Sequence, residues 1–155
     1  MDATLGKYLD IFRNIKVSNR QGMKAPHKAI LLLTVISMIE DGDQVNRNIV
    51  YSDTLKEKFK NMWFEIIGES NVFHPDVAMP FWHLKNEKEI WSLILVNDSP
   101  ETLAALAIST PRSTQQAIRK YVKYAVLPEE LFHLLEDPIA RASLVEVLLE
   151  KYIYV

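Results

Sequence analysis

Residues 29–39 are the feature that most constrains how this 155-residue chain can fold. Within this run only one threonine and one serine interrupt the apolar residues. Pro26 precedes the run and suits the first turn of a helix, where its missing N–H is not needed. Gly42 follows the run and can supply the turn that ends a helix. Because a helix that is apolar almost all round is buried, the sequence predicts a buried helix over residues 26–40.

Apolar residues at helical spacing predict further helices on both sides of this segment. One is expected over residues 3–16, and another from a cap at Ser52 or Asp53 to Gly68. Shorter helices are expected to begin near Pro100, Pro111, Pro128 and Pro138.

Residues 81–85 and 90–96 are rich in aromatic and β-branched side chains and flank a polar turn, a pattern typical of a β-hairpin. In this hairpin we expect Trp82 and Trp91 to lie in the core. The predicted fold class is therefore α+β, mainly α: a helical domain with one small β-hairpin around residues 81–96.

The composition is that of an ordinary globular protein and excludes several classes. Apolar residues make up 48% and charged residues 25% of the chain, and the length fits a single domain over residues 1–155. The absence of cysteine excludes disulfides and thiolate metal sites. The N-terminus has no signal-peptide pattern and the apolar runs are too short for a bilayer, so we expect a cytoplasmic location.

The net charge of −2 hides an asymmetry along the chain. Residues 127–155 hold six acidic and two basic residues, a net charge of −4, whereas residues 1–126 hold 14 acidic and 16 basic residues, a net charge of +2. Because an electrostatic field acts locally, a basic patch in the first part can still attract nucleic acid.

Catalytic motifs are absent from the sequence. No lysine has an acidic residue two positions before it, as a common metal-dependent nuclease core requires. No two histidines stand at metal-ligand spacing on one helix, and the four glycines stand singly, which excludes phosphate-binding glycine loops. We therefore expect a binding domain rather than an enzyme, with no metal and no cofactor; a nuclease would need a scattered site without a motif.

Three groups of residues can bind a ligand. Arg20, Lys24, His27 and Lys28 lie on a loop and at the start of the apolar helix, where N–H groups favour phosphate; a polar loop covering a buried helix fits them equally well. Met79 and Pro80 offer apolar atoms, and a strand that begins with proline usually emerges at the surface.

The third group is Arg112, Arg119 and Lys123, whose spacing places them on one face of a helix. Such a stripe is more often a solvated face than a track for phosphates.

Two motifs resemble one protein family. Residues 25–33, Ala-Pro-His-Lys-Ala-Ile-Leu-Leu-Leu, and residues 80–84, Pro-Phe-Trp-His-Leu, are similar to the DNA sulfur-binding domain at the N-terminus of McrA-type HNH restriction endonucleases. The likeness continues through residues 123–132 and 137–138. The resemblance implies a domain that recognises phosphorothioate DNA, in which sulfur replaces a non-bridging phosphate oxygen, with a nuclease domain beyond Val155 or on another chain.

The resemblance also implies roles for single residues. It adds Tyr124 to the basic residues named above, so the candidate DNA-binding residues are Arg20, Lys24, His27, Lys28, Arg119, Lys123 and Tyr124. The candidate sulfur-pocket residues that it implies are Met79, Pro80 and His83. The family usually has an aromatic residue where Met79 stands, and often a small or polar one where His83 stands. We expect Met79, Pro80 and His83 to border a shallow cavity on the same side as His27 and Lys28. A protein-interaction domain that uses the acidic C-terminal helices is the alternative.

Overall fold

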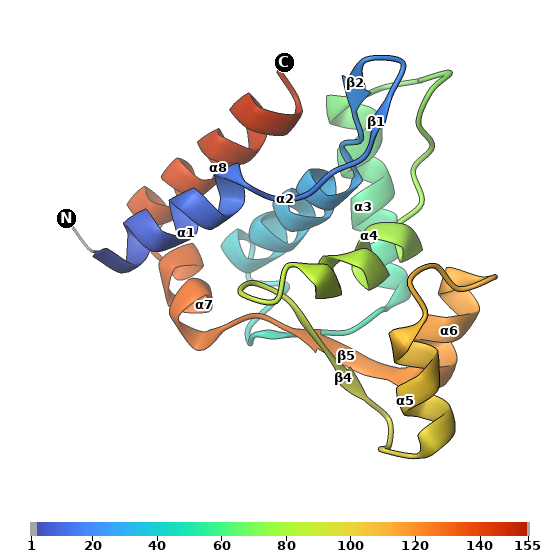
Figure 1. Cartoon of the computed structure of the whole chain (residues 1–155). Coiled ribbons are helices and arrows are strands. Elements are labelled where there is room, and N and C mark those ends of the chain that lie inside the picture. The colour runs from blue at the N-terminus through green and yellow to red at the C-terminus, as the bar shows by residue number, and fades with distance from the viewer. Residues whose placement is uncertain (1–2, 155) are drawn as a thin grey trace.

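The computed structural model describes residues 3–154, and helices make up most of it (Figure 1). The helices are α1 (Ala3–Arg13), α2 (His27–Glu40), α3 (Asp53–Ile66), α4 (Ala78–His83), α5 (Pro100–Ala107), α6 (Thr114–Tyr121), α7 (Glu129–Glu136) and α8 (Pro138–Tyr152), and a 3₁₀ turn, η1, spans Leu84–Asn86. The strands are β1 (Asn19–Arg20), β2 (Met23–Lys24), β3 (Asn48–Ile49), β4 (Ser92–Leu95) and β5 (Val122–Val126). The predicted class, α+β with mostly helix, is confirmed. Within the described residues, none of these helices has the length and apolar character needed to cross a membrane.

Helix α2 is the buried centre of the fold, as its apolar run predicts. Ten of its 14 residues are buried. It packs against α3, α4, α7 and α8, and Figure 1 shows it between α1 and α8 on one side and α3 and α4 on the other. Its one buried hydroxyl, on Thr34, donates to the carbonyl of Ile30 over 2.7 Å, so this polar group is satisfied inside the core.

Helix α3 follows the predicted pattern of cap and apolar stripe. The side chain of Ser52 accepts the backbone N–H of Leu55 over 3.1 Å, which satisfies a free donor of the first turn. Leu55, Phe59 and Trp63 are buried; because they are four residues apart, they lie on one face of the helix, which packs on α2. Gly68 ends this segment with φ +73°, a conformation that glycine adopts without strain.

The predicted β-hairpin over residues 81–96 is wrong in its first half. Phe81 and Trp82 lie in α4, the next residues form η1, and only β4 is a strand. The carboxylate of Asp76 accepts the backbone N–H of Ala78 over 3.0 Å at the start of α4. A short apolar run fits a buried helix as well as a buried strand, so its periodicity does not separate the two.

The aromatic core around α4 is nevertheless the predicted one. Trp82 and Trp91 are both buried. The indole N–H of Trp91 donates to the carbonyl of Phe81 over 3.0 Å, and the two rings meet edge to face with centroids 5.3 Å apart. These contacts fix α4 against the segment that leads into β4.

The three-stranded sheet has the order β3-β5-β4, and all its pairs are antiparallel. Its central strand, β5, is absent from the sequence prediction. Helix α6 ends at Tyr121, as predicted, and the chain continues directly as β5. Lys123 therefore lies on a strand, and the prediction that it shares one helical face with Arg112 and Arg119 is wrong.

The connector before α2, predicted as a polar loop, contains a two-stranded hairpin of β1 and β2. Its turn residues, Gln21 and Gly22, have φ +52° and +78°. Two-residue hairpin turns require this left-handed region, and glycine enters it readily. The hairpin fixes the positions of two candidate residues, Arg20 on β1 and Lys24 on β2.

Candidate functional site

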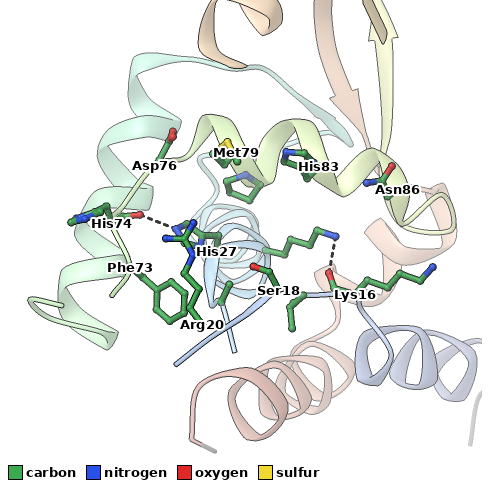
Figure 2. A pocket seen from close by; sticks show the side chains of 14 residues that line it. Lys16, Ser18, Arg20, His27, Phe73, His74, Asp76, Met79, His83 and Asn86 are labelled. Carbon is green, nitrogen blue, oxygen red and sulfur yellow. Dashed lines mark hydrogen bonds between the residues drawn. The ribbon is translucent and has the colours of Figure 1, made fainter. Parts of the chain in front are cut away.

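A cavity of about 440 Å³ lies where the two resembling motifs meet. Its lining residues are Lys16, Val17, Ser18, Arg20, Ala25, His27, Lys28, Phe73, His74, Asp76, Met79, Pro80, His83 and Asn86. Figure 2 shows Met79 and His83 above the cavity on α4, and Lys16 and Asn86 at the end opposite to His74 and Asp76. The structure thus brings the three predicted pocket residues together with His27 and Lys28.

Helix α4 supplies one wall of this cavity. Met79, Pro80 and His83 are spaced so that they fall on one side of the helix, and all three line the cavity. The prediction that Pro80 begins an exposed strand is wrong, because α4 replaces that strand and Pro80 is buried. Its ring lies in the first turn of the helix, where a missing N–H is tolerated. The hydroxyl of Thr114 donates to the sulfur of Met79 over 3.4 Å. The wall is mostly apolar.

His27 stands at the start of α2 and is held by its neighbours. Its Nε2 lies 2.8 Å from the backbone oxygen of His74; because a carbonyl only accepts, Nε2 carries the hydrogen. The ring packs on Trp63 and Phe73, with centroid distances of 4.8 and 5.9 Å. Burial lowers the pKa of His27, although the bond to His74 acts in the opposite direction. At neutral pH this side chain is therefore an uncharged part of the wall.

Lys28 is also engaged within the protein. Its Nζ donates to the side chain of Glu87 over 3.0 Å and to the backbone carbonyl of Lys16 over 2.8 Å. Only 12% of the Lys28 side chain and 10% of the Glu87 side chain are exposed. The charge expected to be free for a phosphate is thus paired with a carboxylate.

His83 completes the uncharged interior of the cavity. Burial is the largest cause that lowers its pKa, and the nearby ammonium groups of Lys28 and Lys85 lower the pKa further. Since an imidazole ordinarily titrates near pH 6.5, His83 is mostly neutral at pH 7. It therefore adds a polar but uncharged edge beside Met79 and Pro80.

Exposed positive charge lies at the mouth of the cavity. Arg20 and Lys16 are exposed and line the cavity. Across residues 3–154, the Arg20 guanidinium has neither a hydrogen bond nor an ion pair, and Figure 2 shows it beside His27 and Phe73. The arrangement is thus a mostly apolar hollow with the paired Lys28 ammonium in its lining. Two cations, Lys16 and Arg20, and one carboxylate, Asp76, are exposed around it.

A family model described as the ScoMcrA-like DNA sulfur-binding domain matches residues 6–154. The chain belongs to this family. The resemblance seen in the two sequence motifs is therefore confirmed, and membership favours DNA binding over the protein-interaction alternative.

A solved structure shares the fold of this sulfur-binding domain. It is the sulfur-binding domain of SprMcrA complexed with phosphorothioated DNA, with a TM-score of 0.71 and 20% sequence identity. The match covers 97% of this chain and 86% of that chain. No curated protein matched the sequence.

Four predicted residues of this sulfur-binding domain lie away from the cavity. Lys24 donates to the carbonyl of Lys151 over 3.2 Å, at the C-terminal end of α8. Lys123 and Tyr124 lie on β5, where the ammonium is 5.9 Å from the centre of the ring. Arg119 is exposed on α6. Their roles in DNA binding stay predictions.

The sulfur-binding domain also has cavity residues that the sequence analysis missed. Lys16, Phe73 and Asn86 line the cavity, and Glu87 pairs with Lys28 from behind it. Lys16 is a basic residue in the same connector as Arg20, so its charge could have identified it as a candidate DNA-binding residue. Glu87 carries no local signal, because its partner lies 59 residues away along the chain.

Proposed function

We propose that this domain binds duplex DNA that carries a phosphorothioate and receives the sulfur atom in the cavity between α2 and α4. It then serves as the targeting part of a restriction system. The observation that carries the proposal is the wall formed by Met79 and Pro80 in the same cavity as the exposed guanidinium of Arg20.

The chemistry of the wall favours sulfur over oxygen. Sulfur is larger, more polarizable and less tightly hydrated than the oxygen that it replaces, so contact with a thioether and a proline ring costs it little water. A phosphate oxygen loses its hydration against the same atoms and gains no hydrogen bond from them, which is unfavourable. The proline ring also loses no side-chain freedom when it is covered.

The rim supplies affinity for the DNA backbone without reading the sequence. Arg20 and Lys16 can each contact a phosphate next to the modified one, and such contacts orient a duplex. Affinity should therefore depend on salt, whereas the preference for sulfur should not, because the preference arises from uncharged contacts.

The test compares one duplex with and without a single phosphorothioate, by fluorescence anisotropy at several salt concentrations. We expect two straight lines of log affinity against log salt with equal slopes, in which the modified duplex binds more tightly at every point. Coincident lines would leave only a general DNA-binding domain, and affinities that do not depend on salt would exclude the phosphate contacts.

A further inference from the structure

Glu87 does not line the cavity, but it follows the lining residue Asn86 in the chain and contacts the lining residues Lys16 and Lys28. One carboxylate oxygen is 3.0 Å from the Nζ of Lys28, and the other accepts the backbone N–H of Lys16 over 3.4 Å. Both side chains of the ion pair are almost fully buried. One carboxylate therefore joins the connector, the start of α2 and the turn after α4 at the edge of the cavity.

The consequence concerns what the cavity offers to a phosphate. An ammonium group binds phosphate as a point charge with hydrogen atoms to donate. If Lys28 were free, it could give a non-bridging oxygen the hydrogen bond that the apolar wall withholds, and the unfavourable loss of hydration would disappear. Sulfur, a weaker hydrogen-bond acceptor, would gain less, so discrimination would fall.

We propose that Glu87 is a specificity-determining residue, which keeps the cavity from binding ordinary phosphates by holding the Lys28 ammonium in an ion pair. The inference rests on the proposed function. A matching arrangement at the neighbouring residue supports it, since the Nε2–H of His27 donates to the backbone carbonyl of His74. The two donors at the start of α2 are thus both bound to protein acceptors.

The experiment replaces Glu87 by glutamine, which can still accept a hydrogen bond but carries no charge. In the Glu87→Gln variant, Lys28 should gain a phosphate contact. Affinity for the unmodified duplex should rise several-fold at low salt, and the salt slope should steepen by about 0.9, roughly a 3.5-fold greater loss of affinity between 50 and 200 mM salt. The preference for the modified duplex should fall.

Two further variants show whether the changes in salt slope and preference come from the release of Lys28. Glu89→Gln changes the net charge equally at an exposed site that does not line the cavity. It should leave the preference unchanged. The double variant Glu87→Gln/Lys28→Gln removes both charges, and the additional salt slope should disappear in it.

Equal behaviour of Glu87→Gln and Glu89→Gln would overturn the inference, as would a steep slope that persists in the double variant. Should Glu87→Gln not fold by circular dichroism, Glu87→Asp withdraws the carboxylate by one methylene and should shift the slope and the preference in the same directions. A wild-type protein without sulfur preference would refute the proposed function instead, because the change in salt slope can be measured on unmodified DNA alone.

Discussion

The imidazole Nε2 of His27 and the backbone oxygen of His74 lie 2.8 Å apart and join two segments that are 47 residues apart in the sequence. The bond fastens the loop before α4 to the start of α2, so that two sides of the cavity are held together. Because the ring is largely buried against Trp63 and Phe73, it has to be uncharged for this packing to persist.

The buried histidines predict how stability depends on pH. Burial lowers the pKa of His27 and of His83 in the folded protein, so below about pH 6.5 the unfolded chain binds more protons than the folded one. The free energy of unfolding should therefore be highest above this pH and fall as the pH drops through the lower pKa of the folded state. Chemical denaturation at a series of pH values between 7.5 and 5 measures this.

The contribution of His27 can be isolated with a second histidine. In His27→Gln the loss of stability on acidification should be smaller than in the wild type. His133 is exposed on α7 beside two glutamates, so His133→Gln should not show this reduction. An unchanged pH dependence in His27→Gln would mean that the ring is not held in its neutral form.

The buried centre of α2 predicts a large effect from a single truncation. Leu32 is 2% exposed, so Leu32→Ala should lower the free energy of unfolding by about 2–5 kcal/mol through lost burial and a cavity. Leu103 on α5 is 52% exposed, and Leu103→Ala should change the free energy of unfolding by no more than about 0.5 kcal/mol. Urea denaturation of the two variants provides the comparison, and similar values would contradict the assigned core.

The exposed guanidinium at the rim predicts a change in salt dependence. Arg20→Gln should weaken binding to modified and unmodified duplexes alike and flatten the slope of log affinity against log salt by up to about 0.9, the loss of one phosphate contact. Lys7 is exposed on α1 and pairs with Glu130, so Lys7→Gln should keep the wild-type slope. If the slope is also unchanged in Arg20→Gln, Arg20 does not contact a phosphate and is only a solvent-exposed residue of the hairpin.

The methionine of the wall predicts a smaller and more specific effect. Met79→Ala should reduce the preference for the modified duplex by roughly 1 kcal/mol, about the contribution of the buried methylenes, while the salt slope stays the same. Met62 on α3 packs partly against the core without lining the cavity. Met62→Ala should keep the preference, and equal losses in the two variants would show that stability rather than contact is measured.

Elements whose pattern is local could be predicted from the sequence. The proline, the apolar run and the glycine around α2 lie within 17 residues, and Ser52 caps α3 where the sequence indicates. The cavity residues on α2 and α4 were predicted from two motifs, and burial of Trp82 and Trp91 followed from their apolar character even though α4 is a helix and not a strand.

Features that depend on distant partners could not be predicted in this way. Strand β5 forms because β3 and β4 supply edges from far along the chain, and nothing local to residues 122–126 distinguishes it from the end of α6. The pairing of Lys28 with Glu87 is equally non-local. The sequence therefore indicated the cation but not the carboxylate that neutralises it.

Variants of Pro80 probe whether the sulfur atom binds at the α4 wall of this cavity. Pro80→Asp replaces an apolar ring by a carboxylate that repels the phosphate group, so it removes the favourable contact and adds an unfavourable charge. Pro80→Ala keeps the wall uncharged and should lose only part of the preference. This milder variant can still be measured if Pro80→Asp does not fold. Thermal unfolding verifies that both variants are native.

The measurement is the ratio of affinities for one duplex with and without a single phosphorothioate, in the wild type and in both variants. We expect the wild type to bind the modified duplex more tightly, Pro80→Ala to keep a reduced preference and Pro80→Asp to bind the two duplexes equally. A folded Pro80→Asp variant that retains the full wild-type ratio, or a wild type with a ratio of one, would contradict this account.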